Sequence, residues 1–172
     1  ASDVYKRQKQ VLAVNGEIYN HREIRTRYAG KYDFQTGSDC EVILALYKDK
    51  GIHFLEDISG IFAFVLYDEE KDEFLIARDP IGVIPLYIGR DKDGKIYFGS
   101  ELKALEGFCD EYELFLPGHY YYSKEGQMKR WYARDWTEYE TVKDNDAKAG
   151  DVKEALEAVS YTHLRAHETS QD

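Results

Sequence analysis

The spacing of apolar residues changes several times along the chain, and each change predicts a different element. Residues 10–14 (QVLAV) are a short apolar run that predicts a strand, and Asn15-Gly16 after it predicts a turn. Residues 61–68 and 73–78 are rich in apolar and aromatic residues and flank a charged turn, which predicts a hairpin of buried strands. Further short strands are predicted at residues 33–36, 86–89, 96–99, 113–116, 119–123 and 128–132.

Helical spacing and polar starting residues predict two helices close together in the chain. The first begins at Asn20, with Glu23 completing a capping box. The second begins at Ser38, with Glu41 in the same relation, and it ends at Gly51. A third, short helix is predicted over residues 101–106.

The order of these elements predicts the fold class. Strands joined by tight turns dominate, so we expect an α+β fold with antiparallel sheets and helices packed outside them, not a doubly wound parallel sheet. Residues 137–150 are polar and lose the apolar period, which predicts a linker. Residues 151–158 begin with Asp151 at an N-cap position and predict the start of another helix.

Composition narrows the class of protein. Of the 172 residues, 43% are hydrophobic and 15% aromatic, which is enough for a packed core and too much for disorder. The net charge of -10 argues against nucleic acid as a partner, and no apolar stretch approaches the length of a membrane helix. No secretory signal opens the chain, and two cysteines, Cys40 and Cys109, are too few for a disulfide framework. We therefore expect a cytoplasmic protein.

The two ends differ in character from the sequence between them. Residues 1–8 (ASDVYKRQ) and 159–169 (VSYTHLRAHET) lack a period that matches their neighbours, and both resemble translated sequencing-library adapter. The alternative is a natural basic start and a natural helical tail. On the adapter interpretation, residues 1–8 and 159–172 are artefacts, and His163 and His167 are not candidate ligands.

Three short strings could carry chemistry, and each also has a purely structural explanation. Asn15-Gly16 is an ordinary turn signal, yet an Asn amide and a following N–H can bind a developing oxyanion. The negative charge of Asp39 could stabilise the positive N-terminal end of a helix, or it could bind a substrate ammonium group. Cys40 could be activated by the same helix start, but no histidine is placed to act as its base, which favours a buried structural thiol.

The remaining strings indicate architecture. Pro80 and Gly82 predict a tight connection, with Arg78 and Asp79 as a buried ion pair that holds it. His21, His53 and His119 have no metal-ligand spacing, so no metal site is predicted. No phosphate-binding Gly-rich loop is present, so we expect no ATP site in this domain.

Taken together, six strings in this order are far more specific than any one alone. NGEIYNH, QTGSDCEVILALY, GIFAFVLYD, ARDPIGVIPLY, SELKAL and LPGHYY resemble the amino-terminal glutaminase domains of the B-type asparagine synthetase family. The resemblance implies a class II glutamine amidotransferase fold: a four-layer sandwich of two antiparallel sheets between helices, here missing its first strands. It implies that residues 9–136 are an N-terminally truncated glutaminase domain, 137–150 a linker, and 151–158 the start of the synthetase domain.

The resemblance also implies site roles. Asn15 and Gly16 match the oxyanion hole, and Asn15, Gly16, Glu17 and Asp39 match glutamine-binding positions. The family's nucleophile is an amino-terminal cysteine, which this sequence lacks, so we expect no glutaminase activity from this polypeptide. ATP and Mg2+ are expected only in the missing synthetase domain, which is the expected partner, and the full-length parent could form a homodimer.

Two alternatives stay open at the level of sequence. One is another class II amidotransferase, of the sugar-phosphate or phosphoribosyl type. The other is a non-catalytic homologue that acts as a binding or regulatory module.

Overall fold

The computed structural model describes residues 3–7 and 9–168. The chain forms two compact units, Ala1–Tyr132 and Ala133–Asp172. No helix among the described residues is both long enough and apolar enough to span a bilayer.

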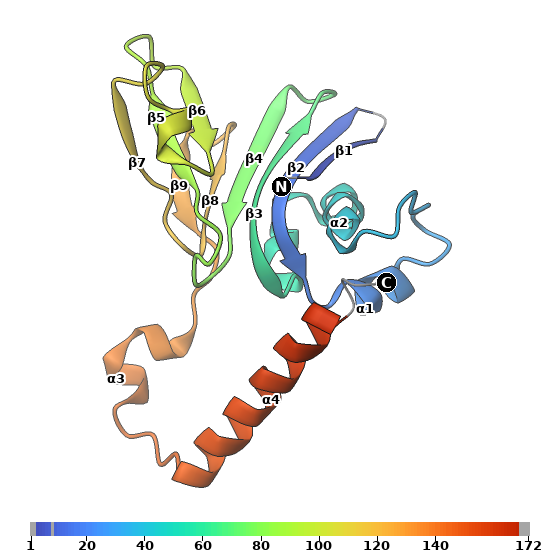
Figure 1. Ribbon diagram of the computed structural model, residues 1–172, viewed down its shortest axis with the longest axis vertical. Coiled ribbons are helices and arrows are strands. Elements are labelled where there is room, and N and C mark those ends of the chain that lie inside the picture. Colours follow the sequence, from blue (N-terminus) through green and yellow to red (C-terminus); the bar gives the residue numbers. More distant parts are fainter. Residues whose placement is uncertain (1–2, 8, 169–172) are drawn as a thin grey trace. The chain divides into compact units, whose positions relative to one another are not determined.

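Two antiparallel sheets form the frame of the first unit (Figure 1). The larger sheet has the strand order β1-β2-β3-β4-β8-β9, with β1 (Asp3–Arg7), β2 (Gln10–Ile18), β3 (Gly60–Asp68), β4 (Glu73–Arg78), β8 (His119–Tyr122) and β9 (Gln127–Arg130). The smaller sheet has the order β6-β5-β7, with β5 (Tyr87–Arg90), β6 (Ile96–Gly99) and β7 (Glu111–Leu114).

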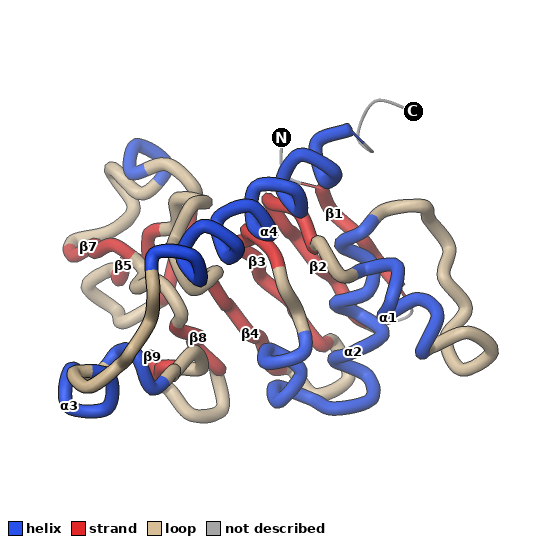
Figure 2. The backbone as a smooth tube through the Cα atoms, turned by 90° about the horizontal axis from the view of Figure 1, so that it is seen from below, coloured by secondary structure: helices blue, strands red, loops and turns tan. Residues whose placement is uncertain are grey.

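Helices cover one face of the larger sheet (Figure 2). They are α1 (His21–Arg27), the 3-10 turn η1 (Asp39–Glu41), α2 (Val42–Lys50) and the 3-10 segment η2 (Gly51–Asp57). The main core lies beneath them, where β2 contributes Leu12, Val14 and Ile18 and α2 buries its residues 42–47. Because α2 is buried along most of its length, its packing against the sheet, rather than its short-range propensity, holds it in place.

A second core lies between the two sheets and contains Ala63, Ile76, Leu86, Ile88, Phe115 and Tyr121. The predicted α+β sandwich of antiparallel sheets is therefore confirmed. In the described part of the first unit, the only helical element after η2 is the short 3-10 turn η3 (Leu102–Ala104), where the sequence predicted a short helix over residues 101–106.

The second unit consists of η4 (Asp135–Thr137), α3 (Tyr139–Val142) and α4 (Ala149–Glu168). The predicted linker at residues 137–150 thus contains a short helix and the first residues of α4. Helix α4 runs through the predicted helix start into the adapter-like residues, and Asp3–Arg7 forms the edge strand β1. Residues 1–2, 8 and 169–172 of the adapter-like ends lie outside the described residues.

Three predictions about the bounds and caps of local elements were wrong. Residues 33–36 form no strand. The strand β2 does not end at Asn15-Gly16 but continues to Ile18. Asn20 does not cap α1 with its side chain: its Nδ2 donates to the Asp57 carbonyl at 2.8 Å, and its Oδ1 accepts from the Ser59 N–H at 3.0 Å.

Candidate functional site

Strand β2 carries three consecutive residues of the predicted site, Asn15, Gly16 and Glu17. Its pairing with β3 is unbroken from Gln10 to Ile18, with Gly16 opposite Phe62. Gly16 has φ +139°, and a Cβ there would lie 2.0 Å from the Ile61 carbonyl oxygen. Only glycine fits this close approach of the two strands. The predicted turn at Asn15-Gly16 is thus a glycine kink inside a strand.

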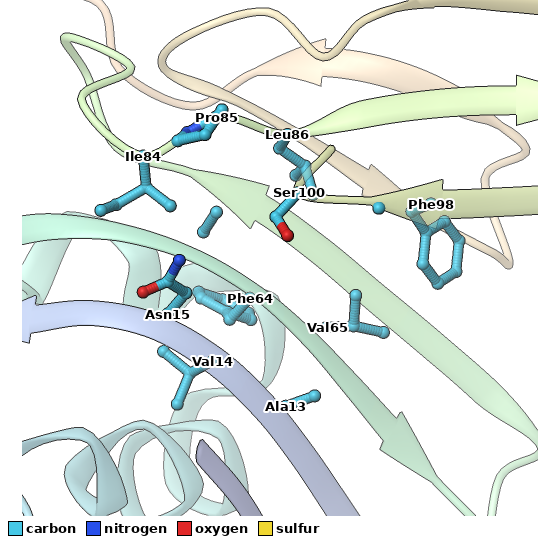
Figure 3. Close-up of a pocket in the computed structure, with 12 residues that line it drawn as sticks. Ala13, Val14, Asn15, Phe64, Val65, Ile84, Pro85, Leu86, Phe98 and Ser100 are labelled. Atoms are coloured by element: carbon cyan, nitrogen blue, oxygen red, sulfur yellow. The ribbon is translucent and has the colours of Figure 1, made fainter. Parts of the chain in front are cut away.

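The Asn15 side chain faces a cavity between the two sheets (Figure 3). The cavity measures about 110 Å³ and is mostly apolar, with Phe64 and Val65 on one wall and Leu86 and Phe98 on the other. Ser100 is a second polar residue at its edge. Among the described residues, none hydrogen-bonds the Asn15 amide, so its NH2 group is available to a ligand.

Asp39 reaches the same strand from the helical layer. It is the first residue of η1, and its Oδ2 accepts a hydrogen bond from the backbone N–H of Ile18 at 2.6 Å. The two residues are 21 positions apart in sequence. The structure therefore brings Asp39 to the end of β2 that carries Asn15, Gly16 and Glu17.

The turn before Asp39 confirms half of the predicted capping box. Ser38 is the N-cap, and its Oγ accepts from the Cys40 N–H at 3.3 Å. Glu41 does not return to Ser38 but binds residues 35 and 36, at 2.7 Å to the Gln35 N–H and 2.8 Å to the Thr36 N–H. Burial alone would raise the Glu41 pKa, but these hydrogen bonds and nearby Arg25 lower it overall.

The two cysteines are present as thiols, and neither is among the residues that line the Asn15 cavity. Cys40 is buried, and its Sγ lies 3.7 Å from the Gly16 carbonyl oxygen, the distance of a weak S–H donor. Burial and the charges of Asp91 and Asp110 raise the pKa of the Cys109 thiol. The structural interpretation of Cys40 is therefore supported.

Tyr19 and His21 also surround the site, although sequence reasoning gave neither a role. Burial, followed by the charges of Glu17 and Asp79, raises the pKa of Tyr19. Burial lowers the pKa of His21 against the opposing effect of Asp39. Their only sequence signal is that they lie two and four positions after Glu17.

The connection from β4 to β5 forms part of the cavity wall and depends on Arg78 and Asp79. Both residues are buried, but the predicted ion pair between these two described side chains does not form. Arg78 donates to the carbonyls of Gly82, Ile84 and Phe115, and Asp79 accepts from backbone amides of residues 81–84. A backbone loop satisfies each charge separately, because both side chains point into it.

Residues 4–132 match the family described as glutamine amidotransferase domain, and since this is most of the chain, the chain belongs to that family. It is 52% identical over 165 residues to asparagine synthetase B [glutamine-hydrolyzing] of Escherichia coli K12, covering 95% of this chain and 30% of that protein.

Another curated relative is also named as an asparagine synthetase. The probable asparagine synthetase of Dictyostelium discoideum is 47% identical over 159 residues, covering 89% of this chain and 28% of that protein. The chain therefore spans less than a third of the length of these curated relatives.

Solved structures confirm the predicted amidotransferase fold. The glutamine phosphoribosylpyrophosphate amidotransferase of B. subtilis superimposes with a TM-score of 0.64 at 28% identity, covering 77% of this chain and 32% of that chain. A structure described as the allosteric regulatory enzyme of purine biosynthesis has a TM-score of 0.62 at 29% identity, covering 77% of this chain and 31% of that one.

Proposed function

We propose that this chain is the glutaminase domain of an ATP-dependent asparagine synthetase, which hydrolyses glutamine to glutamate and ammonia for the amidation of aspartate. The names of the relatives at 47–52% identity support the parent activity. The observation that carries the proposal is that Asp39 is bound to Ile18, three residues beyond the unpaired Asn15 amide. A ligand with an ammonium group and an amide would meet both groups at this strand end.

Each site residue has a proposed role. Asn15 Nδ2 and the Gly16 N–H stabilise the oxyanion that develops on the glutamine side-chain carbonyl, in a cavity whose apolar walls strengthen such bonds. Asp39 binds the α-ammonium group. Glu17, whose carboxylate has no hydrogen-bond partner among the described residues, lies beside it at the α-amino end of the ligand.

The chemistry beyond this domain is proposed for the rest of the parent protein. ATP, Mg2+ and aspartate would bind in a synthetase domain, which is also the partner that receives the ammonia; a homodimer of the parent is proposed with it. Among the residues that the structure describes, no group of three metal-binding side chains occurs. We propose the cytoplasm as the compartment, and two cysteines that are present as thiols support it.

A phosphoribosyl-type amidotransferase is the second candidate, and its support is the structural similarity to the B. subtilis enzyme. The identity to that enzyme is 28%, against 52% to asparagine synthetase B, which favours the synthetase. A non-catalytic binding module would keep the fold without needing the Asn15 amide.

Glutamine binding to the purified chain tests the proposal. We expect saturable binding by NMR titration, and because the polypeptide as given has no amino-terminal cysteine, we propose that it releases no ammonia. Asp39→Asn and Asn15→Ala should each weaken binding by about tenfold, the effect of one charged or well-placed hydrogen bond. Glu113→Gln, on exposed β7, is the matched control.

Two results would contradict the proposal. The first is an absence of glutamine binding, or binding that Asp39→Asn leaves unchanged. The second concerns inactivity: ammonia release that survives Cys40→Ala would show that the chain hydrolyses glutamine without an amino-terminal cysteine.

A further inference from the structure

The segment just before Asp39 has no regular secondary structure, yet two charged side chains hold it tightly. Residues 33–38 are the last part of the connection from α1 to η1 and contain no helix or strand. Arg25 comes from α1 and Glu41 from η1. Together they bind the backbone of Gln35, Thr36 and Ser38.

Glu41 binds the amide groups of this segment. The residue is 2% exposed. Its Oε1 accepts from the Gln35 N–H at 2.7 Å, and its Oε2 accepts from both the N–H and the Oγ1 of Thr36 at 2.8 Å. A buried carboxylate with three donors is a strong anchor, because each bond is charge-assisted.

Arg25 binds the carbonyl groups of the same segment. Its Nη2 donates to the Thr36 carbonyl at 2.9 Å and to the Ser38 carbonyl at 2.5 Å, and it lies 3.6 Å from Glu41 Oε2. Its guanidinium also lies over the Phe34 ring, 4.4 Å from the ring centre. Arg25 and Glu41 therefore act on complementary backbone groups of one short segment.

Ser38 is the last residue that Arg25 holds, and Asp39 follows it directly. Asp39 Oδ2 is fixed by the Ile18 N–H. Asp39 Oδ1 has one contact among the described residues, the Ser38 hydroxyl at 3.5 Å, which is at the limit of a hydrogen bond. Oδ1 is thus the oxygen left for a ligand, and its position depends on where residues 36–38 are held.

We propose that Arg25 and Glu41 are positioning residues that set Asp39 to recognise the α-ammonium group of the amino-acid substrate. This inference rests on the proposed glutamine site and names the side chains that give it selectivity for an α-amino acid. Neither residue touches the ligand. They act through residues 35–38, whose displacement would move Asp39 Oδ1 and weaken recognition of the ammonium group.

The test uses two ligands that differ only in the ammonium group. L-Glutamine and 4-carbamoylbutanoate share the side-chain amide and the carboxylate, so the ratio of their dissociation constants for the full chain reports ammonium recognition. We expect wild-type chain to prefer glutamine, and Asp39→Asn to lose most of that preference. Glu41→Gln should reduce the preference by about tenfold while it changes 4-carbamoylbutanoate binding by less than about twofold.

Milder and combined variants make the test specific. Arg25→Lys keeps the charge but loses the planar guanidinium that lies over the Phe34 ring, and Thr36→Val removes one hydrogen bond to Glu41. Both variants should lower the preference partially. The double variant Asp39→Asn with Glu41→Gln should match Asp39→Asn alone, because both act on one group. Arg27→Ala, on the exposed face of α1, should leave the dissociation constants of both ligands unchanged.

The outcomes separate this inference from the proposed function. If wild-type chain does not bind glutamine, or Asp39→Asn keeps the preference, the proposed site itself is wrong. If Asp39→Asn loses the preference but the Glu41, Arg25 and Thr36 variants retain it, the positioning role is wrong. Equal weakening of both ligands by these variants would also overturn it and would assign the two residues to stability alone. If Glu41→Gln fails to fold, Arg25→Lys and Thr36→Val decide the question.

Discussion

Arg78 donates to the carbonyls of the loop whose backbone amides donate to Asp79, so two adjacent buried residues share one loop. The shortest bond on the anionic side is from the Gly82 N–H to Asp79 Oδ1, at 2.6 Å. The Gly82 carbonyl in turn accepts from Arg78 Nη2 at 2.7 Å. One peptide segment therefore separates the opposite charges and satisfies both.

Asp79→Ala should lower the free energy of unfolding by about 3 kcal/mol, because it removes several hydrogen bonds to a buried charge and leaves the loop amides unpaired. Urea unfolding followed by fluorescence measures the loss. Asp110→Ala, on an exposed residue, should stay within about 0.5 kcal/mol of wild type. A comparable loss in both variants would show that Asp79 has no special role.

Gly16→Ala should cost about 3 kcal/mol or more, since the new methyl group would meet the Ile61 carbonyl oxygen and the backbone φ is positive. Thermal unfolding by circular dichroism measures it. Gly37→Ala is the control, because a Cβ at Gly37 meets no atom within 4 Å. We expect this control to leave stability unchanged or slightly higher. A Gly16→Ala chain as stable as wild type would contradict the close approach of β2 and β3 at Gly16.

Stability should fall in acid partly through Asp68. Burial alone would raise its pKa, but hydrogen bonds from Lys71 and from the Glu70 N–H lower it overall. A lowered folded-state pKa contributes stability that is present above the unfolded value, about 3.9. That contribution is lost as pH falls through the folded-state pKa.

The measurement compares urea unfolding at pH 7 and pH 3. Asp68→Asn should be less stable than wild type at pH 7 and should lose less stability on acidification. Asp93→Asn, on an exposed turn residue, should follow the wild-type pH profile. An Asp68→Asn profile that parallels wild type would rule out this contribution.

In a longer protein that carries this sequence together with an amino-terminal cysteine, Asn15→Ala should lower kcat for glutamine hydrolysis by roughly 10²–10³-fold, with a smaller change in KM. An oxyanion donor acts mainly in the transition state, which is why kcat carries the effect. Steady-state ammonia assays measure both constants. An increase in KM at constant kcat would instead assign Asn15 to ground-state binding.

The sequence predicted those parts of the fold that local pattern determines. The hairpin expected at residues 61–68 and 73–78 is β3 and β4, because its apolar and aromatic residues suit a buried sheet. The end of α2 at Gly51 is also as predicted, with φ +58° at that glycine.

The rest depended on residues far apart in sequence. Asn15-Gly16 has strong turn propensity, and only the backbone of β3 shows that the kink lies inside a strand. Glu41 occupied a capping-box position but bonds to Gln35 and Thr36 instead. The role of Arg25 could not be predicted, because helical spacing does not show which arginine donates to the Thr36 and Ser38 carbonyls ahead of η1.

The nine-residue pairing of β2 with β3 has a consequence for the site. Side chains alternate between the two faces of a strand, and in Figure 3 Asn15 points into the cavity while Val14 points to the other side. A slip of β2 by one residue would turn Asn15 toward the helices and put Val14 or Gly16 in its place. Any other residue of β2 would bring a Cβ against the Ile61 carbonyl at the position of Gly16, which disfavours a shifted pairing of β2 with β3. The register of these two strands therefore also determines which side chain faces the cavity.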